Sequence, residues 1–83
     1  MRSSELWSDT VYTTVARTMQ PLDLVLFNHG PDPWGAHVGV CVGDDQVLHL
    51  CRELGTPVVW SLAEFAARER YAVLIGFKRP RTT

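Results

Sequence analysis

The sequence predicts one small α+β domain, with a mostly antiparallel, curved sheet of about five strands and one or two short helices. Three observations lead to this prediction. Apolar residues alternate with other residues over short runs, turn residues such as Gly and Asp separate the runs, and one Ser-x-x-Glu sequence marks a helix start. A chain of 83 residues buries only about 60–65% of its unfolded surface, which allows one modest core.

The N-terminal segment, residues 1–20, precedes the predicted sheet. Three apolar residues recur there at helical spacing: Val11, Val15 and Met19. They predict a weak helix over residues 9–19, with Ser8 as its N-cap. Three threonines reduce the helix propensity of the same stretch: Thr10, Thr13 and Thr14. We expect the main domain to span residues 21–80 and residues 81–83 to form a loose tail.

The main domain alternates predicted strands with turns. The strands are expected at residues 22–27, 37–42, 46–51, 57–60 and 71–77. Ser61 and Glu64 form a capping box that opens a helix after the fourth strand. Leu62, Phe65 and Ala66 give this helix a buried stripe, and the basic residues 68–70 end it.

The second and third strands form a hairpin that carries His37 and His49. Valines alternate along the first of these strands and leucines along the second, which predicts that both apolar sets face the core. The two apolar sets share a face only if the numbers of each two residues paired across the strands add to an even number. This condition excludes a two-residue turn at residues 44–45. It favours a three-residue loop, either 43–45 or 44–46. Both histidines then lie on the face turned away from the core. With the loop at 43–45, Cys51 lies opposite His37 at about 5 Å between Cβ atoms, and His49 lies diagonal to His37.

Two imidazoles and a thiol beside Gly39 form a candidate catalytic site. A histidine near neutral pKa transfers protons or activates a thiol, so His37 and His49 are candidate catalysts and Cys51 a candidate nucleophile. The alternative is that all three are structural, because a strand cysteine lacks the helix N-terminus that activates a thiol. Cys41 is more simply a small packing residue.

The runs PLDLVLF, HVGVCVGDDQVLHL, VVWSLAEF and YAVLIGFKRP resemble the C-terminal part of an NlpC/P60 domain, from about residue 21 to residue 80. NlpC/P60 proteins are papain-like cysteine peptidases and amidases. The resemblance implies that His37 is the general base and that His49 orients it. The chain departs from the family at two points: Leu22 replaces the Gly of the G-D-L-V motif, and no cysteine precedes Cys41, so the usual nucleophile is absent.

Three residues are candidates for the substrate-binding part of this site. Gly39 lies between the histidines in the hairpin. Trp34, in the loop before His37, is placed either to wall a substrate pocket or to plug the open end of the sheet. Asp23 of the strand motif stands near the site in the resembling family, although its alternation with leucines predicts a covered, hydrogen-bonded and structural side chain.

Three functions follow. The first is acid-base or thiol-assisted chemistry by His37 and His49 on a small peptide-like or acyl substrate, of the hydrolase or transferase type. The second is an inactive module that binds a peptide, a carrier protein or a metabolite. The third is one half of a homodimer or of a hetero-oligomer whose other chain supplies the missing helix and nucleophile.

Composition excludes other classes. The net charge is −1 and the only basic cluster lies at residues 78–81, which argues against nucleic acid as a partner. No apolar run has the length of a membrane span or the character of a signal sequence, so we expect a cytoplasmic protein without a membrane partner. His29 adds a third imidazole, but no metal-ligand spacing is present, so we expect neither a metal nor another cofactor.

Overall fold

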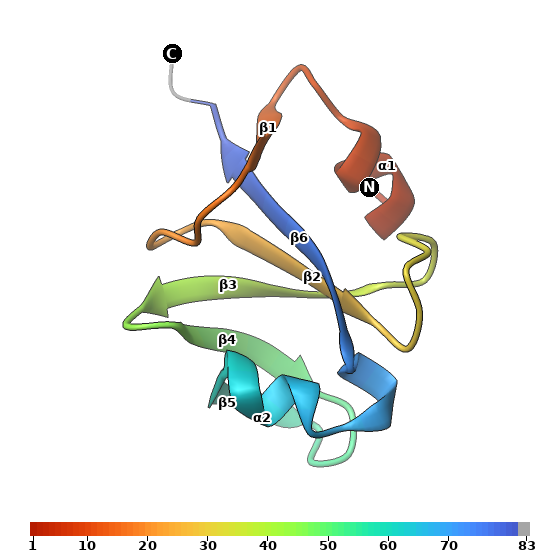
Figure 1. Cartoon of the computed structure of the whole chain (residues 1–83), viewed down its shortest axis with the longest axis vertical. Coiled ribbons are helices and arrows are strands. Elements are labelled where there is room, and N and C mark those ends of the chain that lie inside the picture. The colour runs from red at the N-terminus through yellow and green to blue at the C-terminus, as the bar shows by residue number, and fades with distance from the viewer. Residues whose placement is uncertain (82–83) are drawn as a thin grey trace.

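The computed structural model describes residues 1–81 and contains one six-stranded antiparallel sheet, in the order β1-β6-β2-β3-β4-β5 (Figure 1). The strands are β1 Thr13–Ala16, β2 Leu24–Asn28, β3 His37–Gly43, β4 Gln46–Cys51, β5 Thr56–Ser61 and β6 Val73–Pro80. Two short helices, α1 Ser3–Ser8 and α2 Leu62–Ala66, and a 3-10 turn, η1 Glu69–Tyr71, complete the described fold. The α+β class is confirmed, with six strands rather than about five.

The additional strand lies where a helix was predicted. The helix over residues 9–19 is wrong: α1 ends at Ser8, and β1 pairs with β6. The Asp9 carboxylate accepts hydrogen bonds from the backbone N–H groups of Val11, Tyr12 and Thr13. These bonds hold residues 9–13 in a turn, so the helix does not continue past Ser8. The β-branched residues that follow favour a strand. The sheet therefore begins before residue 21.

The end of the chain is tied to the same region. Arg81, predicted to be loose, donates its backbone N–H to the Tyr12 carbonyl and its Nε to the Thr10 carbonyl. The rest of the predicted tail, residues 82–83, lies outside the described residues.

Helix α1 docks on β6 through Trp7 and Gly76. A Cβ atom on Gly76 would lie 2.6 Å from the Trp7 ring, so only glycine admits the indole here. The Lys78 ammonium, buried beside the same ring, donates hydrogen bonds to the Trp7 and Asp9 carbonyls at the C-terminal end of α1. The cation thus satisfies carbonyls that a helix end leaves free.

Helix α2 and η1 form the core with the sheet face that carries the histidines. The predicted capping box is confirmed, with Ser61 Oγ accepting from the Glu64 N–H and Glu64 Oε1 accepting from the Ser61 N–H. The Phe65 ring of α2 stacks on Phe27 of β2 with ring centroids 4.0 Å apart. The buried core cluster consists of Val25, Phe27, Cys41, Val47, Phe65 and Tyr71.

The hairpin satisfies its predicted register by a different turn. Val40 pairs with Leu48 and Cys41 with Val47, which confirms the even-sum register. The exclusion of a two-residue turn is wrong, because Gly43 pairs with Gln46, and Asp44 and Asp45 both have positive φ angles, 52° and 57°. The register shifts between Cys41 and Gly43, where a bulge adds one residue to β3. This extra residue makes the two-residue turn compatible with the even-sum register further along the strands.

The prediction of which hairpin face meets the core is also wrong. His49, Cys41 and Cys51 are buried, whereas the opposite face is partly open. Its exposed apolar residues are Val42, Leu48, Leu50 and Val59. The reason lies outside the hairpin: α2 and η1 bring the Phe65 and Tyr71 rings onto the histidine face, so the bulky apolar groups that fill the core come from elsewhere in the chain.

Candidate active site

His37 and His49 are joined by a hydrogen bond across the β3–β4 ladder. The distance from His37 Nε2 to His49 Nδ1 is 2.9 Å, and the rings are nearly perpendicular, at 88°. Extended by one residue from the Val40–Leu48 pair, the register places Gly39 opposite His49, as the predicted diagonal arrangement requires. A Cβ atom on Gly39 would lie 2.5 Å from Val47 Cγ1 and 3.4 Å from His49 Cβ. Because Gly39 has no side chain, the Val47 and His49 side chains of β4 pack directly against the β3 backbone at this position.

His49 lies in an aromatic enclosure and is only 3% exposed. Its ring centroid is 4.3 Å from that of Trp60, 4.5 Å from that of Phe65 and 6.0 Å from that of Tyr71. Within residues 1–81, the buried His49 Nε2 has no hydrogen-bond partner. Since buried polar atoms are nearly always paired, this nitrogen marks an unusual site.

Burial lowers the pKa of both histidines. For His37, the Glu53 carboxylate opposes the effect of burial, while the Arg52 and Arg70 guanidiniums add to it. For His49, burial is again the main cause, and the neighbouring His37 lowers the pKa further. Burial therefore favours the neutral form of both rings, in which each ring carries one proton.

His37 borders a small polar hollow of about 130 Å³. The hollow is lined by Asn28, Gly35, Ala36, His37, Arg52, Arg70 and Tyr71. The Tyr71 ring lies against His37, with centroids 4.8 Å apart. The hollow has room for a few atoms beside the imidazole, and its two guanidiniums are groups that bind a carbonyl oxygen or a carboxylate.

Cys51 is buried on the same face as the histidines, at 1% exposure. Its thiol donates a hydrogen bond to Glu53 Oε2 at 3.3 Å, and no hydrogen bond in residues 1–81 joins it to either imidazole. Glu53 also accepts from the Tyr71 hydroxyl and pairs with Arg70 at 3.3 Å. A backbone hydrogen bond, followed by the one from Cys51, holds the pKa of Glu53 below its ordinary value.

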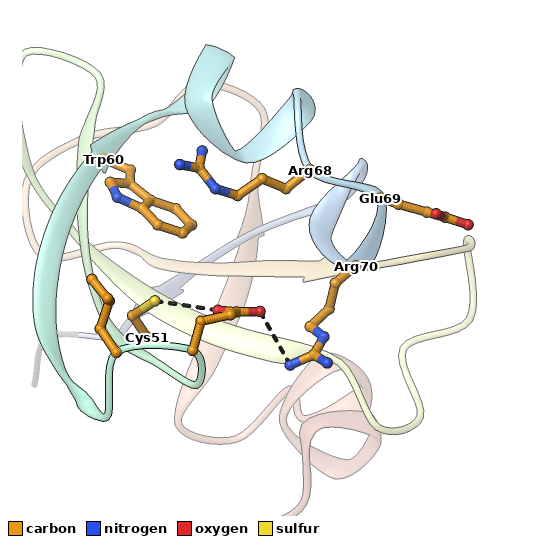
Figure 2. A pocket seen from close by; sticks show the side chains of 7 residues that line it. Cys51, Trp60, Arg68, Glu69 and Arg70 are labelled. Atoms are coloured by element: carbon orange, nitrogen blue, oxygen red, sulfur yellow. Dashed lines mark hydrogen bonds and ion pairs between the residues drawn. The ribbon is translucent and has the colours of Figure 1, made fainter.

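A larger pocket of about 470 Å³ lies beside Cys51 (Figure 2). It is lined by Cys51, Glu53, Leu54, Trp60, Arg68, Glu69 and Arg70. Sequence reasoning missed Glu53, because this residue lies in the turn after β4, beyond the strand alternation that places His49 and Cys51 on one face. It also missed Tyr71 and Arg70, whose approach to the hairpin depends on how α2 docks.

Asp23 and Trp34 do not join the histidine pair. The Asp23 carboxylate is buried and accepts two hydrogen bonds from Arg79 at 2.8 Å each, which lower its pKa. It also accepts the Gln20 N–H, so it fixes the entry into β2. Trp34 is 67% exposed and lines a separate hollow with Arg2, Ser3 and Gly35.

The remaining sequence candidates have other surroundings. Cys41 packs in the core, and neither cysteine forms a disulfide. The His29 ring contacts the Asn28 side chain rather than the pair. Across residues 1–81 we find no group of three or more His, Cys, Asp or Glu side chains placed to hold a metal ion.

Comparisons of the chain with protein-family models, with curated proteins and with solved structures found no match. In the part of the chain that the structure describes, no helix has both the length and the apolar character needed to cross a membrane.

Proposed function

We propose that the chain is an NlpC/P60-like hydrolase or transferase in which His37 is the general base for a reaction on a small peptide-like or acyl substrate. The observation that carries the proposal is the 2.9 Å hydrogen bond from His37 to His49, beside a hollow that His37 borders. A base whose far nitrogen is held by a second residue has a fixed ring orientation and a defined proton position.

The aromatic enclosure of His49 favours one of the two possible proton arrangements. If His37 Nε2–H donates to His49 Nδ1, the neutral His49 ring carries its proton on Nε2, among the rings of Trp60, Phe65 and Tyr71. An N–H group is attracted to an aromatic face, whereas a lone pair gains nothing there. This arrangement leaves His37 Nδ1 without a proton, as a general base requires.

The proposed reaction proceeds without a protein nucleophile. His37 Nδ1 accepts a proton from water, or from an acceptor hydroxyl or amine, as its oxygen or nitrogen attacks the substrate carbonyl carbon. Arg52 and Arg70 stabilise the negative oxygen that forms. The intermediate collapses with cleavage of the carbonyl carbon to leaving-group bond, and the His37 imidazolium returns the proton to the leaving group.

The conformation of Leu22 supports the family resemblance. Leu22 has a φ of +74°, in the left-handed region that glycine adopts readily and leucine does not. It is also the position at which the G-D-L-V motif has its glycine. A glycine at this position, as in the family motif, would adopt this backbone without strain, which supports the resemblance although the residue differs.

One observation favours a binding module instead. The Cys51 thiol donates to the Glu53 carboxylate, and within residues 1–81 no thiol is hydrogen-bonded to His37 or His49. In this alternative, the histidines and arginines hold a peptide, a carrier-protein segment or a metabolite without turnover.

The third function considered from the sequence, one half of a homodimer or of a hetero-oligomer, also stays a prediction, which the mass of the protein in solution tests.

Turnover of acyl esters and of peptide p-nitroanilides by matched variants tests the proposal. His37→Asn should lower kcat by about a hundredfold or more, since general-base catalysis contributes roughly 10²–10⁴. Cys51→Ala should retain most of the activity. His29→Asn is the matched control, because this exposed histidine lies outside the pair. Unchanged turnover in a folded His37→Asn variant would reject His37 as the base, and binding without any turnover by the wild type would favour the module.

A further inference from the structure

The pocket beside Cys51 has two walls of different character (Figure 2). Trp60 and Arg68 lie together on one side, and Cys51 lies across from them. Glu69 points away from the pocket in this view. The volume of about 470 Å³ is within the range of small-molecule sites, roughly 300–1,000 Å³. The space is therefore large enough for a ligand of a dozen or so heavy atoms.

Arg68 is the pocket cation that lacks a carboxylate partner. Its guanidinium carbon lies 3.8 Å from the Trp60 ring centroid, and NH1 donates to the Glu64 carbonyl at 2.6 Å. Among residues 1–81, it forms no ion pair. Stacking and one hydrogen bond thus fix the plane of the guanidinium and leave further N–H groups for a ligand, the geometry that binds a carboxylate.

The acidic group that faces the pocket is already neutralised. Glu53 pairs with Arg70 and accepts hydrogen bonds from Cys51 and Tyr71. Its charge is therefore balanced within the protein. The other acidic lining residue, Glu69, points away from the pocket (Figure 2), and Arg68 places a cation on the side opposite Cys51. An anionic ligand group meets Arg68 without having to displace an existing ion pair.

The pocket also offers apolar surface. Leu54 is 65% exposed at its border, and the half-buried Trp60 indole forms part of its wall. A ligand group that covers Leu54 and the indole removes apolar surface from water. We propose that this pocket binds a small carboxylate ligand with an apolar side group, such as an N-acyl amino acid, with its carboxylate on Arg68 and its apolar group against Leu54 and Trp60.

The ligand is a substrate only if the proposed function holds, so this proposal rests on that function in this respect. Binding is therefore measured separately from turnover. N-acetyl-L-leucine and its primary amide are the probes, at constant ionic strength, and the indole N–H signals in ¹H–¹⁵N NMR spectra are the readout. The acid should shift the Trp60 signal saturably, with a Kd on the order of 1 mM. Trp7 and Trp34 lie outside the pocket and serve as internal controls. The amide should bind roughly tenfold more weakly, because it lacks the charge.

Arg68→Gln should reduce the affinity for the acid to that for the amide. Arg17→Gln is the matched control, since it removes an exposed cation that does not line this pocket. Equal binding of acid and amide, an unchanged affinity in Arg68→Gln, or no response of Trp60 would overturn the proposal. A protein that binds the acid through Arg68 but turns over no substrate keeps this site and rejects only the proposed catalysis.

Discussion

At the scale of single residues, chemical environment decides the role of each candidate. His37 and His49 are one hydrogen-bonded unit, whereas Cys51, two residues along the same strand face, is bound to Glu53. The sequence indicated that the three share a face, because strand alternation fixes this. It did not indicate the partner of the thiol, because Glu53 lies in the turn after β4, where alternation loses its meaning.

Leu22 provides a residue-scale prediction. Its left-handed backbone costs a non-glycine residue roughly 1–2 kcal/mol, and glycine loses about 0.5–1 kcal/mol to the entropy of the unfolded chain. Leu22 is 72% exposed, so its side chain contributes little burial. Leu22→Gly should therefore raise the free energy of unfolding by roughly 0.5–1 kcal/mol in urea titrations. A destabilised variant would show that the Leu22 side chain matters more than its φ angle.

At the scale of elements, local pattern located most strands but did not determine which sheet face is covered. Alternation correctly grouped Val40 with Leu48 and Cys41 with Val47. The covered face depends on where α2 docks, and this is a contact between distant parts of the chain. The N-terminal error has a similar origin: the spacing of Val11 and Val15 suits a helix, but pairing of β1 with β6 and the Asp9 turn prevail.

The docking of α1 on β6 gives the element-scale prediction. Gly76→Ala places a methyl group 2.6 Å from the Trp7 ring, on a backbone with φ of +151°, so the indole must move. We expect a loss of about 1–3 kcal/mol in the free energy of unfolding and a changed Trp7 indole signal.

Gly30→Ala is the matched control for this experiment. A Cβ atom at Gly30 would meet nothing within 4 Å, so stability should change little. Equal stability of the two variants would contradict the claim that α1 docks because Gly76 leaves room for the Trp7 ring.

At the scale of the whole molecule, the two faces of the sheet are covered to different extents. Helix α2 and η1 bury the histidine face, while α1 covers part of the other face and leaves the apolar residues of β3–β5 exposed. The α+β class followed from the alternating apolar runs, the turn residues between them and the Ser-x-x-Glu helix start. The sites did not, because the pocket beside Cys51 and the hollow beside His37 both require the docked position of residues 68–71.

The buried histidines should make the stability of the whole domain depend on pH. Their pKa values are lowered in the folded state, so as pH falls below about 6.5 the unfolded chain takes up protons that the folded chain does not. The free energy of unfolding should therefore decrease from pH 6.5 downward, until the folded pKa values are reached. Asp9 and Asp23, also with lowered pKa values, contribute only at lower pH, below about 4.

Urea unfolding of wild type and His37→Gln between pH 5 and pH 7, a window below and around the histidine value of about 6.5, measures this effect. The variant should show a shallower dependence on pH, because it removes one of the titrating groups. A wild-type stability that rises as the pH falls would mean that the imidazolium forms are stabilised by the fold, contrary to the burial of the pair.

The proposed function requires that His37 Nδ1 carries no proton while His37 Nε2–H donates to His49 Nδ1. Imidazole ¹⁵N chemical shifts at pH 7 test it most directly, because they report the proton on each ring nitrogen. We expect protons on His37 Nε2 and on His49 Nε2, with His37 Nδ1 unprotonated. A proton on His49 Nδ1, donated to a bare His37 Nε2, would contradict it, since His37 Nδ1 would then carry a proton and not act as the base.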